Sequence, residues 1–328
     1  MRPATDLNSF QGHIRNLQAE INESLRTLSL ADQPDYLYTP VKYVLKGTGK
    51  RLRPILVYLV GETFSADPGD LLNAGLAVEL LHNFTLVHDD IMDADSTRHG
   101  QPTVHEKWDE STAILAGDGI YALGQLLISQ VKINTLQAIR AFNVATLMVC
   151  EGQAYDKEFE HNHNISLEQY FTMIEKKTGW LIGLCAEVGG ILGDQDEEVR
   201  SHLRSYGINL GKVFQIQDDI LEIYGNEKSM GKSLGSDLVA GKQTVLTVLA
   251  RELFPAEWAG YWRKIQQLEI DEALSELRGY LEEKNILQRA RELVDTYDKR
   301  ARDDLNAAFG GYPHILKEFT DMVINRKK

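Results

Sequence analysis

Three aspartates gather in residues 86–100, where a run of apolar residues gives way to the sequence LVHDDIMDADSTRHG. Asp89 and Asp93 are four residues apart, so on a helix they lie on one face with Asp90 beside them. Because carboxylates this close repel one another, we expect a cation to neutralise them. Mg²⁺ prefers oxygen ligands and is often held by one or two carboxylates together with substrate phosphates. The segment therefore predicts a magnesium site, although a solvated acidic helix face would have the same short pattern.

A second acidic motif lies far downstream in the sequence FQIQDDILE at residues 214–222. Asp218, Asp219 and Glu222 repeat the spacing of the first motif inside a similar apolar helical pattern. Basic residues follow both motifs. Two acidic patches that face each other would clamp metal ions, and the second copy makes a merely solvated surface a much weaker interpretation.

A basic turn precedes the first motif. Gly47, Thr48 and Gly49 lead into Lys50, Arg51 and Arg53, and Pro54 follows in a new apolar stretch. Proline is well tolerated in the first turn of a helix, where the exposed N–H groups favour anions. The turn is therefore a candidate phosphate-binding site, and a generic basic loop is the alternative.

Residues 70–92 form a long apolar pattern that predicts one helix leading into the first acidic motif. On an ideal helix His82 lies within about 20° of Asp89. A single histidine on such a face is often a core residue, but its position two turns before the acids favours a binding role.

Two lysine-containing segments could bind an anion. Lys176 and Lys177 precede Thr178 within an apolar stretch, and a lysine in such surroundings needs an anionic partner. The later sequence GNEKSMGKSLGSDLVAGKQTV places Lys232, Asp237 and Lys242 among glycines, and flexible backbone of this kind can close over a phosphate.

Long helices should position these residues. The 328 residues are 43% hydrophobic and 25% charged, with only 8 prolines to interrupt helices. Helical periodicity also covers residues 5–30, 114–128 and 141–156, and Ser166 with Glu168 and Gln169 predicts another helix start. Length alone would suggest two domains, but without a recognisable linker we expect a single domain over residues 1–328. Residues 256–328 carry no motif and are assigned to packing or to a lid.

Composition excludes several classes of function. A net charge of −13 argues against a nucleic-acid partner, because binding a phosphate backbone requires a basic face. The apolar runs are far shorter than the roughly 18 residues that a membrane span needs, and the start of the chain lacks the apolar core of a signal peptide. Two cysteines are too few for a disulfide framework or a zinc site. We therefore expect a soluble cytoplasmic protein.

Five segments in order resemble the trans-isoprenyl diphosphate (polyprenyl) synthases, and together they span most of the chain. They are GKRLRP at 49–54, DDIMD with the trailing arginine at 89–98, KTG at 177–179, FQIQDDILE at 214–222, and GKSLGSD followed by GK at 231–242. The resemblance implies an all-α bundle of long antiparallel helices around a central cavity, in a chain that forms a homodimer.

The resemblance also assigns roles to individual residues. It implies three Mg²⁺ ions with substrate bound, held by Asp89, Asp93 and Asp218, with Asp90, Asp219 and Glu222 as further ligands or as support. The allylic diphosphate would be held by Arg98, Lys177, Thr178, Gln215, Lys232 and Lys242. Isopentenyl diphosphate would be held by Lys50, Arg53 and His82.

The implied reaction is a head-to-tail condensation. Metal ions and protein cations stabilise the leaving diphosphate, an allylic carbocation forms, and isopentenyl diphosphate attacks it before a proton is lost. The family motif usually ends in Arg-Arg-Gly, but this chain has His99 after Arg98. A neutral histidine makes one contact to a phosphate where arginine makes two, so we expect weaker and pH-sensitive binding of isopentenyl diphosphate. Glu222 is a second departure, because many relatives have aspartate there.

Product length is expected to depend on the residues just before the first motif. In the family an aromatic residue at the position of Phe84 marks short products, and Thr85 with the short acidic spacing most resembles geranylgeranyl diphosphate synthases. A farnesyl or longer polyprenyl product is the alternative. On an ideal helix Thr85 lies within about 40° of Asp89, whereas Phe84 is turned away by about 140°, so Phe84 could instead be a core residue.

Two other classes share parts of this pattern. A class I terpene cyclase would also use the first acidic motif and Mg²⁺, but its second motif normally begins with asparagine and it would not need GKRLRP. A non-catalytic subunit of a prenyltransferase is the other alternative, and the intact acids of both motifs argue against it.

Overall fold

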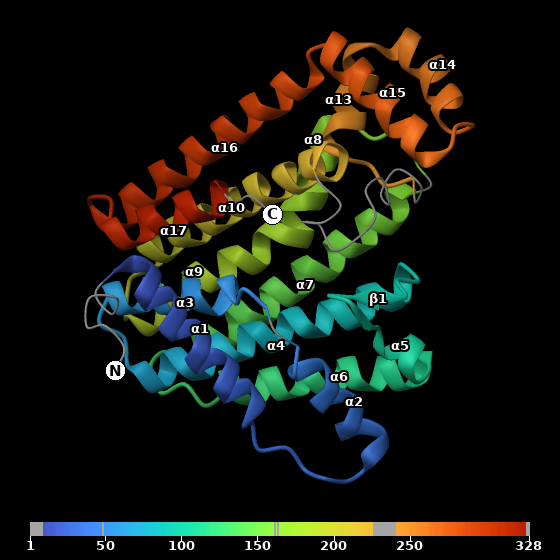
Figure 1. Cartoon of the computed structure of the whole chain (residues 1–328). Coiled ribbons are helices and arrows are strands. Elements are labelled where there is room, and N and C mark those ends of the chain that lie inside the picture. Colours follow the sequence, from blue (N-terminus) through green and yellow to red (C-terminus); the bar gives the residue numbers. More distant parts are fainter. Residues whose placement is uncertain (1–8, 48, 161, 163, 226–240, 326–328) are drawn as a thin grey trace. The chain divides into compact units, whose positions relative to one another are not determined.

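The computed structural model describes residues 9–47, 49–160, 162, 164–225 and 241–325. These residues are almost entirely helical (Figure 1), which confirms the predicted all-α class. Among them, the only strands are β1 (Thr97–Arg98) and β2 (Gln101–Pro102), which form an antiparallel hairpin. The helices are α1 (Phe10–Arg26), α2 (Asp35–Leu45), α3 (Leu52–Thr63), α4 (Pro68–Met92), α5 (Val104–Lys107), α6 (Glu110–Ile128), α7 (Thr135–Glu160), α8 (Leu167–Ile174), the π-helical turn η1 (Glu175–Gly179), α9 (Trp180–Leu192), α10 (Glu197–Tyr224), α13 (Val245–Leu253), α14 (Pro255–Ile265), α15 (Ile270–Glu283), α16 (Ile286–Phe309) and α17 (His314–Ile324).

The chain packs as two compact units, each built from separate stretches of sequence. Unit 1 combines the described residues within Met1–Thr146, Leu184–Arg204 and Gly311–Phe319. Unit 2 combines those within Leu147–Gly183, Ser205–Gly310 and Thr320–Lys328. The first acidic motif belongs to unit 1 and the second to unit 2. The single domain expected from the sequence stays a prediction.

Unit 1 is organised around α4, the long helix predicted before the first acidic motif. The helix begins at Pro68 after the N-cap Asp67, whose side chain accepts from the backbone N–H of Asp70. Figure 1 shows α6 running beside α4. The two helices approach closely at Gly117, where a Cβ atom would lie 2.3 Å from Nε2 of His88. The small residues of α6 therefore permit close packing against α4.

Unit 2 contains the helix start predicted at Ser166. The Ser166 side chain accepts from the N–H of Gln169, and the Gln169 side chain accepts from the N–H of Ser166, which completes a capping box for α8. Further along the chain, α13, α14, α15 and α16 contribute to one hydrophobic core with α8 and α10, in which Trp258 and Leu277 are buried. The described part of residues 256–328 in this unit therefore has a packing role.

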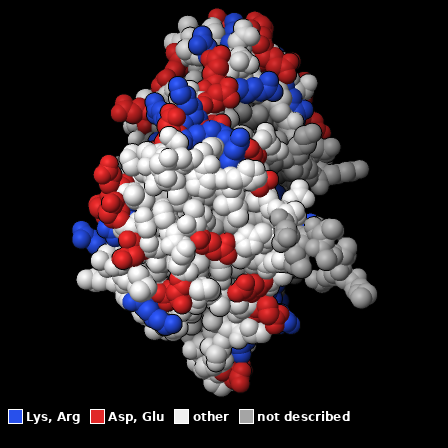
Figure 2. Space-filling model, turned by 90° about the vertical axis from the view of Figure 1, so that its left-hand side faces the viewer, with Lys and Arg blue, Asp and Glu red and all other residues white. Residues whose placement is uncertain are grey.

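Charged side chains are unevenly distributed over the surface. Figure 2 shows acidic and basic side chains close together at the top of one face, above a wide area that carries few charged side chains. By length and composition alone, α6 is apolar enough to cross a membrane, and 44% of its most apolar window is buried within the protein. An apolar helix that contributes to a protein core has the same composition, so this helix is weak support for a membrane span.

Candidate active site

The first acidic motif occupies the end of α4. Asp89 and Asp93 are half-buried and one helical turn apart, and the Asp93 N–H donates to the Asp89 carbonyl over 2.8 Å. Asp90 is only 5% exposed and accepts from the Arg98 guanidinium, whose Nε lies 2.6 Å from Oδ1. Nη2 of Arg98 also donates to Asp95 over 3.2 Å. Arg98 therefore neutralises the buried Asp90, whereas Asp89 and Asp93 form the pair with the spacing and chemistry that suit a metal ion.

The Arg98 cation is held in place by these carboxylates. Burial lowers the pKa of Arg98, but the hydrogen bond and charge of Asp90, together with the charges of Asp95 and Asp89, raise that pKa above its ordinary value. Because a guanidinium has five N–H donors, Arg98 can bind Asp90 and Asp95 and still offer a donor to a substrate anion.

The hairpin after the first motif positions both Arg98 and His99. Arg98 pairs with Gln101 across the two strands, and the connecting residues His99 and Gly100 have φ angles of 51° and 74°. Two positive φ values in a two-residue connection are typical of a type I′ turn. His99 is exposed at the tip of this turn. The Tyr43 hydroxyl donates to the Pro102 carbonyl over 2.8 Å and fixes the second strand.

The basic turn before α3 divides into a buried and an accessible part. Arg51 is only 8% exposed, forms an ion pair with Glu79, and donates to the Asn22 side chain over 2.9 Å. This arginine therefore stabilises unit 1, and it is not available as a third phosphate ligand beside Lys50 and Arg53. Lys50 is exposed on the same turn.

Arg53 and His82 lie together, as the site prediction requires. Nη1 of Arg53 lies 3.1 Å from Nε2 of His82. Burial lowers the pKa of His82 well below its ordinary value, and the positive charges of Arg53 and Arg98 lower it further. His82 is therefore neutral at physiological pH and can accept the Arg53 hydrogen bond at Nε2.

Phe84 lies at the contact between α4 and α6. Its ring centroid is 4.7 Å from that of His88 and 5.2 Å from that of Tyr121. The neighbouring Thr85 hydroxyl donates to the His82 carbonyl over 2.8 Å. Phe84 is half-buried, so its ring both packs against α6 and keeps part of its surface accessible.

The second acidic motif lies near the end of α10. Asp219 is only 4% exposed, and its Oδ2 accepts from the Tyr170 hydroxyl and the Val245 N–H, each over 2.7 Å. Gln215 Nε2 donates to the other oxygen over 3.0 Å. Burial raises the pKa of Tyr170 well above its ordinary value, and the negative charge of Asp219 raises it further. Asp219 is thus a buried carboxylate held by neutral donors, next to the half-buried Asp218.

The remaining acid of this motif is also buried. Glu222 is only 6% exposed and lies one turn after Asp218 on α10. Its longer side chain does not change its position on the helix face, because residues four apart align.

A π-helical turn presents the predicted lysine and threonine. Lys176 forms an ion pair with Glu151 and Lys177 forms one with Asp156, so both lysines have the anionic partners expected from the sequence. The Thr178 hydroxyl donates to Oε1 of Gln215 over 3.0 Å, which links η1 to the second acidic motif. Single π-helical turns of this kind often occur at functional sites.

Glycines on two neighbouring helices make room for the π-helical turn. A Cβ atom at Gly152 of α7 would lie 2.1 Å from the backbone nitrogen of Lys177. One at Gly211 of α10 would lie 2.6 Å from Cα of Gly179. A larger residue at either position would push η1 away from its neighbours.

The glycine-rich loop after α10 is only partly described. Lys232 and Asp237 lie outside the described residues. Lys242 is half-buried and follows Gly241, which has a φ angle of 70°. The Gln243 side chain donates to the Gly241 carbonyl over 3.2 Å, so this end of the loop is fixed just before α13.

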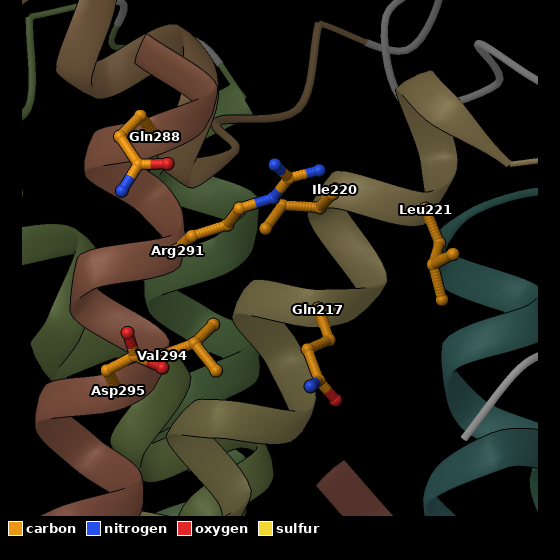
Figure 3. Close-up of a pocket in the computed structure, with 7 residues that line it drawn as sticks. All are labelled: Gln217, Ile220, Leu221, Gln288, Arg291, Val294 and Asp295. Carbon is orange, nitrogen blue, oxygen red and sulfur yellow. The ribbon is translucent and has the colours of Figure 1, made fainter. Parts of the chain in front are cut away.

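A separate groove lies between α10 and α16 and has a volume of about 460 Å³ (Figure 3). In Figure 3 the side chain of Arg291 extends from α16 toward Ile220 of α10. On an ideal helix the face that carries Gln217, Ile220 and Leu221 is about 125° from the face that carries Asp218 and Glu222. The groove is therefore distinct from the acidic site. Its lining residues are Gln217, Ile220, Leu221, Gln288, Arg291, Val294 and Asp295.

The described residues contain no group of three or more histidine, cysteine, aspartate or glutamate side chains that could hold a metal ion. A magnesium ion that arrives with a diphosphate needs only one or two carboxylates from the protein. The hard oxygens of Asp89, Asp93 and Asp218 match this requirement.

Comparison with known proteins decides the family. The polyprenyl synthetase family model matches residues 34–276. The chain belongs to the polyprenyl synthetase family. It is 42% identical over 238 residues to the short chain isoprenyl diphosphate synthase of Methanocaldococcus jannaschii, with 72% of each chain covered. It is 33% identical to the geranylgeranyl diphosphate synthase of Sulfolobus acidocaldarius, with 98% of this chain and 100% of the relative covered.

Solved structures of the family have the same fold. A crystal structure of a geranylgeranyl pyrophosphate synthase matches with a TM-score of 0.88 and 34% identity, covering 98% of this chain and 100% of that chain. The geranylgeranyl pyrophosphate synthetase of Pyrococcus horikoshii matches with a TM-score of 0.88 and 32% identity, covering 97% and 98%. The isoprenoid synthase fold expected from the sequence is confirmed, and this polyprenyl synthetase is a trans-prenyltransferase.

The sequence did not reveal several partners of the site in this polyprenyl synthetase. Asp156 forms an ion pair with Lys177, and Tyr170 donates to Asp219. Gln153 lies on the same face of α7 as Asp156. A signal was present for α7, because a glycine is followed by glutamine and aspartate in an otherwise apolar helix at residues 152–156. Tyr170 gave no such signal, since an aromatic residue in an amphipathic helix is ordinarily a core residue.

Proposed function

We propose that this enzyme condenses isopentenyl diphosphate head-to-tail with an allylic diphosphate to form geranylgeranyl diphosphate. One observation carries the proposal: each acidic motif pairs a half-buried aspartate, Asp89 or Asp218, with a buried aspartate that the protein itself holds. The charge and partial exposure of Asp89 and Asp218 suit a metal ion and its diphosphate. The product follows the names of several relatives, which are geranylgeranyl diphosphate or pyrophosphate synthases.

The acidic motifs supply the magnesium site. Asp89, Asp93 and Asp218 bind the ions, and Asp90, Asp219 and Glu222 support them. When bound, Mg²⁺ stabilises negative charge on the leaving diphosphate. A site of this type needs no protein nucleophile, because the chemistry is electrostatic stabilisation of a leaving group.

Protein cations and polar side chains hold the two substrates. Lys177, Thr178, Gln215 and Arg98, together with Lys232 and Lys242 of the glycine-rich loop, bind the allylic diphosphate. Lys50, Arg53, His82 and His99 bind isopentenyl diphosphate. A neutral His82 accepts from Arg53 and keeps its guanidinium oriented. Apolar helix faces exclude the water that would quench an allylic cation.

A product assay tests the proposal. Purified enzyme is incubated with Mg²⁺, isopentenyl diphosphate and each of three allylic primers, and the dephosphorylated products are separated by chromatography. Consumption of isopentenyl diphosphate with formation of geranylgeraniol supports the proposal. Conversion of the allylic substrate to a cyclic hydrocarbon without isopentenyl consumption identifies a terpene cyclase, and no conversion of either substrate identifies a non-catalytic subunit.

The contact between α4 and α6 limits the length of the product. Phe84 packs against Tyr121 at this contact, so a smaller side chain at position 84 opens space below the growing chain. We expect Phe84→Ala to make products longer than the wild type and Thr85→Phe to make shorter ones. Chromatography of the products measures this. Wild-type products beyond twenty-five carbons, or an unchanged profile in Phe84→Ala, would contradict the role of Phe84.

The enzyme forms a homodimer and acts in the cytoplasm without a membrane span. Large apolar side chains on α6 and α7 are exposed in the single chain: Leu126 is 60% exposed and Leu136 is 76% exposed. A second copy of unit 1 would cover them, because large exposed apolar side chains are typical of interaction surfaces. Sedimentation without detergent should give twice the mass of one chain, and a monomer would contradict the dimer.

A further inference from the structure

Gln153 of α7 is a buried side chain whose hydrogen-bonding groups have no partner. It is only 7% exposed, and neither its Nε2 nor its Oε1 has a hydrogen-bond partner among the described residues. A buried amide left unpaired is costly, and nearly all buried polar groups in folded proteins are paired. Both atoms of one side chain being unpaired indicates that a ligand completes its bonds.

Gln153 lies between two residues of α7 that contact Lys177. Gln153 follows Gly152, which contacts the backbone of Lys177, and it precedes Asp156, which forms an ion pair with Lys177. Gly152, Gln153 and Asp156 are all buried, and on an ideal helix Asp156 lies about 60° from Gln153. The unpaired amide therefore lies on the face of α7 against which the Lys177–Thr178 segment packs.

We propose that Gln153 binds the diphosphate of the allylic substrate, which rests on the function proposed above. A carboxamide offers two N–H donors and one acceptor oxygen. Its N–H groups donate to a diphosphate oxygen, and its oxygen accepts from the Lys177 ammonium when that lysine turns from Asp156 toward the diphosphate. The amide groups of Gln153 thus have no hydrogen-bond partner without substrate and are fully hydrogen-bonded when substrate binds.

This proposal predicts that stability and binding change in opposite directions. Methionine is close to glutamine in shape and carries no polar group that burial would leave unpaired. Gln153→Met should therefore fold. Its unfolding temperature should equal that of the wild type or lie about 2 °C above it. The same variant should bind diphosphate about tenfold more weakly or worse, because it loses hydrogen bonds to a charged group.

The experiment measures the unfolding temperature and the affinity for inorganic diphosphate in the presence of Mg²⁺, by calorimetry, for the wild type and three variants. Gln153→Glu adds a charge that repels the anion and should bind more weakly than Gln153→Met. Gln217→Met is the control for binding, because Gln217 of the same unit also has a buried unpaired Oε1 but lines the groove of Figure 3, and its Nε2 donates to the Ile324 carbonyl over 2.6 Å. It should bind diphosphate like the wild type. In turnover assays, Gln153→Met should raise KM for the allylic diphosphate and leave KM for isopentenyl diphosphate unchanged.

Other results would overturn the proposal. Wild-type diphosphate affinity in Gln153→Met would show that the amide does not contact the ligand. A failure of Gln153→Met to fold would show that the amide is satisfied inside the protein and has a structural role. In both of these cases the wild type would still form product. If the proposed function were wrong, the wild type itself would form no product.

Discussion

The two acidic motifs share a spacing but differ in how the protein holds their second aspartate. In unit 1 Asp90 accepts from a cation, Arg98, which lies eight residues further along the chain. In unit 2 Asp219 is held by neutral donors from three elements: Tyr170 of α8, Gln215 of α10 and the N–H of Val245 at the start of α13. The first arrangement is local in sequence, and the second requires tertiary structure.

The residues that hold the second aspartate also link each motif to a different segment of the chain. Arg98 connects Asp90 to the hairpin that carries His99. Gln215 connects Asp219 to Thr178 and the π-helical turn, and Val245 connects it to the end of the glycine-rich loop. A repeated short motif can therefore serve the same chemistry while its supporting residues link it to different substrate-binding segments.

The largest effect is expected at the first aspartate of each pair. Asp89→Asn and Asp218→Asn replace a charged metal ligand with a neutral one and should lower kcat by at least about a hundredfold, with the free energy of unfolding nearly unchanged. Steady-state kinetics at saturating substrate and Mg²⁺ measure this. Near wild-type turnover in either variant would remove that residue from the metal site.

A smaller effect, on the free energy of unfolding, should distinguish how the protein holds Asp90 from how it holds Asp219. Arg98→Met leaves the buried Asp90 without its cation and should lower the free energy of unfolding by about 2 to 3 kcal/mol, somewhat less than for a fully buried pair. Tyr170→Phe removes a neutral donor to Asp219 and should cost about 1 kcal/mol. Urea unfolding of both variants makes the comparison, and equal losses would contradict the contrast between the motifs.

The smallest effect concerns pH. Burial lowers the folded-state pKa of His82, so the unfolded chain binds a proton more readily below about pH 6.5 and stability should fall as the pH decreases. His82→Gln removes this titration. Between pH 7.5 and 5.5 the free energy of unfolding should fall by about 1 kcal/mol more in the wild type than in the variant. Parallel losses in both proteins would show that His82 is protonated as easily when folded as when unfolded.

Much of this architecture could be predicted from sequence because its signals are local. The apolar periodicity of α4, the capping box at Ser166 and the acidic spacing each depend on residues within one or two helical turns. The π-helical turn could not be predicted, since it needs Gly152 and Gly211 on two other helices. Arg51 looked like a phosphate ligand for a related reason: its ion pair with Glu79 joins residues far apart in sequence.

One measurement tests most directly whether the two aspartates of each pair have different roles. Calorimetry of Mg²⁺-dependent binding of inorganic diphosphate, with urea unfolding of the same samples, is carried out on Asp89→Asn, Asp90→Asn, Asp218→Asn and Asp219→Asn. We expect Asp89→Asn and Asp218→Asn to lose binding and keep their stability, and Asp90→Asn and Asp219→Asn to lose stability first. Equal loss of binding in all four variants at unchanged stability would show that both aspartates of each pair are metal ligands and would contradict this account.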